Sequence, residues 1–221
     1  MIFNTAQKSI SEQQANELVC LRQSITAAES DNPFYRCFEG GMLTLNAFIR
    51  KVPDRVVYWG TSGQRITDSY HFDACCMKEL LDYSRLLHGK DIRGQLTPPS
   101  FEDIKTNIQF HYDTIRKYAS STGRSIYSFG WLLDIARCIY TLRTGKIISK
   151  TAAGEWALQN CLFHNITALE TALEVRKNPQ KYLESAELQA LSGKLGNAIQ
   201  QYADVLEKEL KTTSFVGVCT F

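Results

Sequence analysis

Apolar residues recur every three or four positions along much of this chain, which is the spacing that places side chains on one face of a helix. The first such run follows Ser11, where S-E-Q-Q forms a capping-box pattern with Gln14 as the third helical residue. Four apolar residues then share one face: Ala15, Leu18, Val19 and Ile25. The pattern predicts a helix over residues 11–28.

Runs of β-branched and aromatic residues around this helix predict short strands. Met1-Ile2-Phe3 is typical of the end of a buried strand, and residues 34–45 predict a second strand after a turn at Asn32-Pro33. Residues 55–59 (RVVYW) predict a third strand, and the turn-like segment at residues 60–63 favours a hairpin.

A second helix is predicted after Asp73, whose short acidic side chain suits an N-cap. Four apolar residues after it have helical spacing: Met77, Leu80, Leu81 and Leu87. Gly89 is suited to end this helix. The order of strand, helix, strand, strand and helix indicates an α/β arrangement.

Two adjacent prolines in GQLTPPS, residues 94–100, cannot continue a helix and they stiffen the chain. We place a domain boundary here, between residues 1–96 and residues 97–221. Every segment beyond it has helical spacing. The first predicted helix starts at Ser100 and has Ile104, Ile108 and Ile115 on one face. Three more are predicted over Tyr127–Leu142, closed by Gly145, over Ser149–Cys161 and over His164–Lys177. A long helix from Ser185 is the last. The fold class is therefore α+β, a partial α/β sheet followed by an all-α helical bundle.

Composition narrows the class of protein. Hydrophobic residues make up 44% of the 221 residues and the net charge is +2, so the chain is globular and its charge favours neither nucleic acid nor a membrane surface as a partner. It has no apolar run long enough to span a bilayer and no signal-peptide pattern, so we expect a cytoplasmic protein. We interpret the seven scattered cysteines as small core residues, and without a CxxC pair we expect no zinc site.

One stretch, residues 131–158 (WLLDIARCIYTLRTGKIISKTAAGEWAL), has several unusual features in a fixed order. These are Arg137 and Tyr140 in an Arg-x-x-Tyr helix, the turn TGKI, Ser149-Lys150, and the segment GEWAL. The stretch resembles the C-terminal helical domain of the aminoglycoside nucleotidyltransferases, in particular the streptomycin and spectinomycin adenylyltransferases. A weaker resemblance extends upstream through FEGG, YWG and LHGK. It implies a partial nucleotidyltransferase domain over residues 1–96 and a C-terminal bundle over residues 97–221.

The resemblance implies an activity, namely the transfer of AMP from ATP to a hydroxyl of an aminoglycoside or aminocyclitol. In this family two aspartates hold Mg²⁺ against the triphosphate, and a third carboxylate takes the proton of the attacking hydroxyl or assists the metal. Glu39 falls at that third position, although a lone acid in a strand is also commonly just a solvated side chain.

The Gly-Ser turn and the Asp-x-Asp pair of this family precede the first helix. Residues 1–9 contain no aspartate and no glycine, so we assign no metal ligand. We expect ATP and Mg²⁺ as the cofactors of the family, and we expect this chain to be inactive in AMP transfer. Without the two strands that carry these family residues, the strand that holds Glu39 would have an unpaired edge. The chain could associate with itself through that edge.

Five further residues are candidates for binding, each with a simpler alternative. Trp59 could stack on a cationic group of the substrate, or it is a core aromatic. Glu155 could bind an amino or guanidino group, or it is a surface acid, and Thr151 stands where the adenylyltransferases carry an aspartate. Arg176 and Lys177 could reach the ATP phosphates, or they are cations favoured by a helix C-terminus.

Other interpretations remain open. Arg137, among apolar neighbours, needs an anion such as Asp134, Glu155 or a phosphate, and we favour a structural partner. A non-enzymatic remnant, or an interaction module built on the helical bundle, is the alternative function. An RNA-cleaving bundle protein is disfavoured, because the nearest Arg and His at suitable spacing, Arg65 and His71, precede the bundle.

Overall fold

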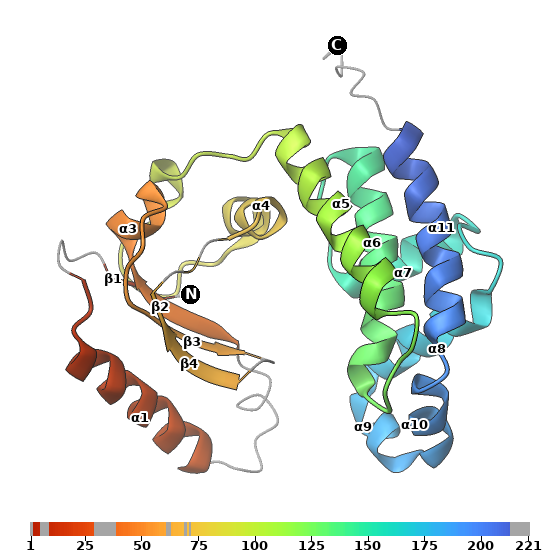
Figure 1. The fold of residues 1–221 in the computed structure, drawn as a ribbon, viewed down its shortest axis with the longest axis horizontal. Helices are drawn as coiled ribbons and strands as arrows, with labels where there is room; N and C mark the ends of the chain where they lie inside the picture. The colour runs from red at the N-terminus through yellow and green to blue at the C-terminus, as the bar shows by residue number, and fades with distance from the viewer. Residues whose placement is uncertain are drawn as a thin grey trace. The chain divides into compact units, whose positions relative to one another are not determined.

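The computed structural model describes residues 2–4, 9–28, 39–60, 63–68, 70 and 72–212. The chain forms two compact units, drawn in Figure 1. The first comprises Met1–Phe72 with Leu86–Thr97, and the second comprises Asp73–Arg85 with Pro98–Phe221. A small sheet in the first unit and helices throughout the second confirm the predicted α+β class.

Within the described residues the first unit has a four-stranded sheet in the order β1-β2-β3-β4. The strands are β1 (Ile2–Asn4), β2 (Gly40–Thr44), β3 (Val56–Gly60) and β4 (Gly63–Thr67). β1 runs parallel to β2, and the other neighbours are antiparallel. The predicted first strand and the predicted hairpin are therefore confirmed. The unpaired edge predicted beside Glu39 is wrong, because β2 lies between β1 and β3.

Helix α1 (Glu12–Ala28) packs on this sheet, where Ile10, Ala15, Val57 and Trp59 form a small core. The predicted capping box is present: the Gln14 N–H donates to Ser11 Oγ at 3.2 Å, and the Ser11 N–H donates to Gln14 Oε1 at 2.9 Å. The predicted apolar face fails at its far end, because Ile25 is 45% exposed.

The strand predicted over residues 34–45 differs from the structure. Residues 34–38 lie outside the described part, and Glu39 precedes β2 instead of lying within it. Leu45 already begins a short helix, α3 (Leu45–Arg50), which the sequence pattern did not predict. Leu45 and Phe48 are both buried, and their spacing of three places them on the same side of that helix.

Helix α4 (Ala74–Tyr83) starts as predicted, with the Cys76 N–H donating to Asp73 Oδ1 at 2.7 Å. It ends six residues before the predicted Gly89, and Leu87, predicted to lie on its apolar face, is outside the helix and 93% exposed. A short 3₁₀ turn, η1 (Arg93–Gln95), follows in the connection.

Helix α4 groups with the second unit, although the sequence placed it within residues 1–96. Its Ala74 and Cys75 pack against the core of the helices, and the Cys75 N–H donates to Asn107 Oδ1 at 3.3 Å. Packing on α5 therefore decides that α4 belongs to the second unit. The two prolines mark just one of the points at which the chain passes from one unit to the other.

The second unit is a bundle centred on α6, as Figure 1 shows. Its remaining elements are α5 (Phe101–Tyr118), η2 (Ile126–Phe129), α6 (Gly130–Thr144), α7 (Lys150–Gln159), α8 (Ile166–Lys177), α9 (Pro179–Glu184), α10 (Ala186–Ser192) and α11 (Gly196–Thr212). Helix α6 packs against α5, α7, α8 and α11, and most of its side chains are buried. The strongly apolar sequence of α6 is the reason it takes the centre.

Most helix starts and stops in the bundle confirm their sequence signals. Ser100 forms a capping box with Asp103, and the Ala152 N–H donates to Ser149 Oγ at 3.1 Å. Gly145 ends α6 with a φ of 67°, a left-handed conformation that glycine adopts without strain.

The single long helix predicted from Ser185 is wrong, because the chain turns between α10 and α11. A Cβ atom on Gly196 would lie 2.1 Å from the Ser120 carbonyl oxygen, and the Leu195 N–H donates to Thr122 Oγ1 at 3.2 Å. The turn thus lets α11 start in close contact with the loop after α5.

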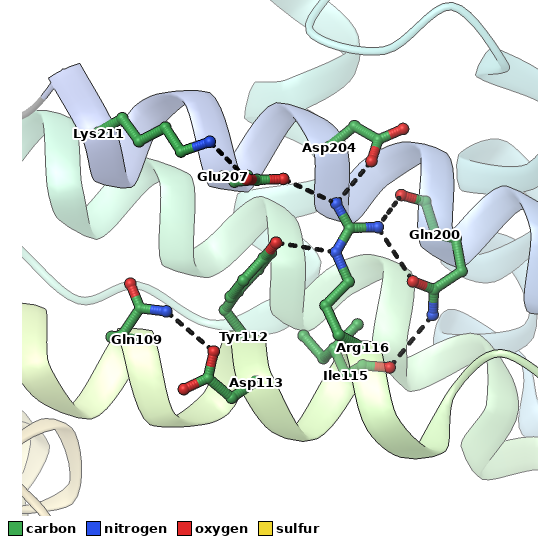
Figure 2. Close-up of polar contacts among 9 residues, drawn as sticks. All are labelled: Gln109, Tyr112, Asp113, Ile115, Arg116, Gln200, Asp204, Glu207 and Lys211. Atoms are coloured by element: carbon green, nitrogen blue, oxygen red, sulfur yellow. Dashed lines mark hydrogen bonds and ion pairs between the residues drawn. The ribbon is translucent and has the colours of Figure 1, made fainter.

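An arginine on α5 joins this helix to α11, as Figure 2 shows. The Arg116 guanidinium donates to the Tyr112 hydroxyl at 2.9 Å and to Gln200 Oε1 at 3.0 Å. It also pairs with Asp204 at 2.5 Å and with Glu207 at 3.2 Å. This network orients α11 against the bundle.

The cysteines are less buried than predicted. Cys138 is in the core and Cys75 is partly buried, but Cys20, Cys76 and Cys161 are exposed. Cys37 and Cys219 lie outside the described residues. A membrane-crossing helix would need a longer apolar run than any helix in the described part of the chain provides.

Candidate substrate-binding site

Two of the predicted site residues lie in the first unit, Glu39 just before β2 and Trp59 on the neighbouring strand β3. Glu39 is exposed and directly precedes Gly40, which is paired with Trp59 in the β2–β3 register. A Cβ atom at Gly40 would lie 3.3 Å from Trp59 Nε1, so the glycine leaves room for the indole ring.

Trp59 itself is buried beneath α1. Its side chain is 6% exposed, and the guanidinium carbon of Arg22 lies 5.8 Å from the centre of its ring. An intramolecular cation thus occupies the position that a cationic ligand would take. This geometry supports the core-aromatic interpretation, and stacking of Trp59 on a substrate stays a prediction.

Magnesium would require several acids around Glu39. In the described part of the chain, three or more His, Cys, Asp or Glu side chains nowhere gather in a way that could hold a metal ion. The described residues beside Glu39 therefore do not fit a magnesium site.

The other predicted residues lie in the second unit, on α7 and α8, which pack closely. Helix α7 carries Gly154, where a Cβ atom would lie 2.7 Å from Leu133 of α6 and 2.9 Å from Leu173 of α8. Glycine at this position therefore allows α7 to contact both neighbouring helices. Thr151 and Glu155, four residues apart on α7, share one face of it.

An ion pair joins a predicted substrate-binding residue to a predicted nucleotide-binding residue. Lys177 Nζ of α8 lies 2.5 Å from Glu155 Oε1 of α7, and the two side chains are 50% and 45% exposed. Arg176 is the neighbouring residue in the last turn of α8, and within the described residues it forms no ion pair. The structure thus places an acid of α7 and a cation of α8 together at an exposed edge of the bundle, with Arg176 next to Lys177 along the chain.

A second charged cluster lies where α4, α6 and α7 meet, and the sequence pattern did not assign it as a whole. Asp134 of α6 pairs with Arg137 at 3.3 Å and with Lys150 of α7 at 2.8 Å. Arg137 also pairs with Glu79 of α4 at 3.0 Å. Burial lowers the pKa of Arg137, but Asp134 and Glu79 raise it above its usual value. The structural partner expected for Arg137 is therefore present.

His111 of α5 borders this cluster and stacks on Trp131, with ring centres 5.9 Å apart. Burial lowers the pKa of His111, Asp134 opposes this shift, and the cations Arg137 and Lys150 add to it. His111 is consequently neutral at neutral pH. The spacing of Asp134 and Arg137 was the only sequence signal for this cluster, because its other members are distant along the chain.

Comparison with protein families matches residues 104–208 to the family described as aminoglycoside adenylyltransferase, C-terminal domain. Over these residues the chain is aminoglycoside adenylyltransferase-like. The matched segment runs from the first turn of α5 almost to the end of α11. It includes Lys150 and Glu155, the two charged residues of α7. Comparison with curated proteins gives no match.

The match confirms the resemblance recognised in residues 131–158. It begins after the first unit of this adenylyltransferase-like protein, so the nucleotidyltransferase assignment of residues 1–96 and the role of Glu39 stay predictions.

Proposed function

We propose that the helical unit binds ATP and a cationic aminoglycoside or aminocyclitol, as the ligand-binding part of an AMP-transfer system. The observation that carries this proposal is the ion pair between Glu155 and Lys177 within the matched domain. It brings a carboxylate suited to an ammonium or guanidinium group next to a lysine suited to phosphate.

The two kinds of ligand use different residues in this proposal. Arg176 and Lys177 bind phosphate oxygens of ATP, with the planar guanidinium able to make two parallel hydrogen bonds. Glu155 binds a cationic group of the acceptor. Thr151 offers a hydroxyl on the same face of α7, which can make one hydrogen bond to the acceptor. The resembled enzymes have an aspartate at this position, which implies an ion pair instead.

The transfer itself needs more than binding. In the resembled enzymes a carboxylate at the position of Glu39 would accept the proton of the attacking hydroxyl, and further acids would hold magnesium against the triphosphate. The 221 residues contain no Asp-x-Asp pair, and the described residues group no acids around Glu39. We therefore propose that these 221 residues bind the ligands without transferring AMP.

Calorimetric titration of the whole chain tests the proposal. We expect ATP to bind and Arg176→Ala to weaken ATP binding roughly tenfold, because a charge-assisted hydrogen bond at an exposed side chain contributes the lower end of about 1.5–3 kcal/mol. We expect Glu155→Gln to weaken the binding of streptomycin or spectinomycin. The control is Lys181→Ala, which removes an exposed cation whose partner is Glu174 of α8, at 2.6 Å.

A pyrophosphate assay with Mg-ATP and either antibiotic tests the second part. No release above background is expected. Turnover that disappears in Glu39→Gln would contradict the proposed inactivity. Absence of binding for both ATP and antibiotic would contradict the binding role and favour the alternative of a non-enzymatic interaction module.

A further inference from the structure

Two lysines flank the proposed acceptor site on α7, and each has an acidic partner. Lys177 pairs with Glu155, while Lys150, the first residue of α7, pairs with Asp134 of α6. Asp134 is much the less exposed of these two acids, with 13% of its side chain exposed against 45% for Glu155. The charge balance at the start of α7 therefore depends on a shielded carboxylate.

The cluster around Asp134 is balanced in charge. Arg137 and Lys150 are its cations, and Asp134 and Glu79 are its paired acids, with Glu79 bound to Arg137. Loss of the Asp134 charge would leave Lys150 uncompensated beside Thr151. The positive end of the α7 dipole lies at the same place and would add to the repulsion of a cationic ligand.

We propose that Asp134 is a positioning residue for acceptor specificity, an inference that rests on the proposed function. It draws the Lys150 ammonium toward α6 and neutralises it. The first two turns of α7 then present Thr151 and Glu155 to a cationic acceptor without a competing positive charge from Lys150. The residue acts through Lys150 and does not itself contact the acceptor.

Asp134→Asn tests this by removing the charge and keeping the shape. We expect streptomycin or spectinomycin affinity to fall roughly three- to sevenfold, the order of effect that one nearby uncompensated unit charge has at a solvated surface. ATP affinity should not fall, because added positive charge does not oppose phosphate. The control Glu209→Gln removes another shielded acid, 18% exposed and paired with Arg143 of α6, and should leave both affinities unchanged.

The double variant Asp134→Asn/Lys150→Met separates charge from structure. If Asp134 acts by neutralising Lys150, removal of the lysine restores acceptor affinity to within about twofold of wild type. If Asp134 serves only to hold α6 to α7, the double variant stays as weak as Asp134→Asn, and the inference is wrong. An Asp134→Asn protein that binds the acceptor as wild type does would also overturn it.

Lys150→Met alone keeps the inference testable should Asp134→Asn not fold. A neutralised lysine predicts unchanged or tighter acceptor binding in this variant, whereas a structural bridge predicts weaker binding. If the wild-type protein binds ATP and acceptor but these variants bind the acceptor equally well, the role of Asp134 is refuted and the proposed function is not. Wild-type protein that binds neither would refute the proposed function and this inference together.

Discussion

Replacement of Gly196 by alanine tests how closely α11 approaches the loop after α5. A Cβ atom at Gly196 would lie 2.1 Å from the Ser120 carbonyl oxygen, well inside normal contact distance. The obstacle is backbone, so it cannot yield as a side-chain end can. Overpacking of this kind costs about 1–3 kcal/mol, and the helix propensity of alanine returns at most about 1 kcal/mol. We expect Gly196→Ala to lower the free energy of unfolding by about 2 kcal/mol.

Gly130→Ala is the matched control. Gly130 is also the first residue of a helix, but a Cβ atom added to it would have no neighbouring atom within 4 Å among the contacts of the described residues. The variant should be neutral or stabilise the protein by up to about 1 kcal/mol. Urea unfolding followed by circular dichroism in the far ultraviolet measures both variants. Equal unfolding midpoints for the two variants would refute the reasoning about Gly196.

Three further predictions concern the bundle and its cysteines. Arg116→Ala should lower the free energy of unfolding by about 1–2 kcal/mol in urea titrations, through its lost hydrogen bonds to Tyr112 and Gln200, and wild-type stability would contradict this. The hydrogen bond from Lys211 lowers the pKa of Glu207 from 4.5 to about 2. The stabilising effect of ionised Glu207 is therefore present above pH 4.5 and lost as pH falls through about 2. Glu207→Gln should have a lower urea midpoint than wild type at neutral pH, and the two midpoints should converge near pH 2. Burial raises the pKa of Cys138, so mass spectrometry after thiol alkylation of the folded protein should find Cys138 unmodified and Cys20 modified.

Local signals predicted the helix boundaries well where a side chain caps the helix directly. Ser11, Asp73, Ser100 and Ser149 each accept the hydrogen bond that their sequence context predicts. Such caps involve residues close together along the chain, so the sequence contains both partners. Gly145 likewise needs only its own left-handed conformation to end α6.

Sequence reasoning failed where a distant segment decides the structure. The break before Gly196 depends on Ser120, and the placement of α4 depends on Asn107 of α5. Leucine spacing alone could not show that Leu87 is exposed. In each case tertiary packing overrides a periodic pattern.

The candidate site divides in the same way. Family-like residues on α7 and α8 could be assigned from the sequence, and the structure adds that Glu155 and Lys177 form a pair. The partner of Lys150 is sixteen residues away on another helix, and the second acid on Arg137 is fifty-eight residues away. Charge compensation over such separations is visible only once the helices are packed.

The membership of α4 in the helical unit has a practical consequence for domain exchange. A fragment cut at Pro98 would retain every residue of the matched family segment yet lose residues 73–85, and with them the Glu79 partner of Arg137. Chimaeras that swap helical units between relatives should therefore transplant residues 73–85 along with the bundle, by a two-segment graft.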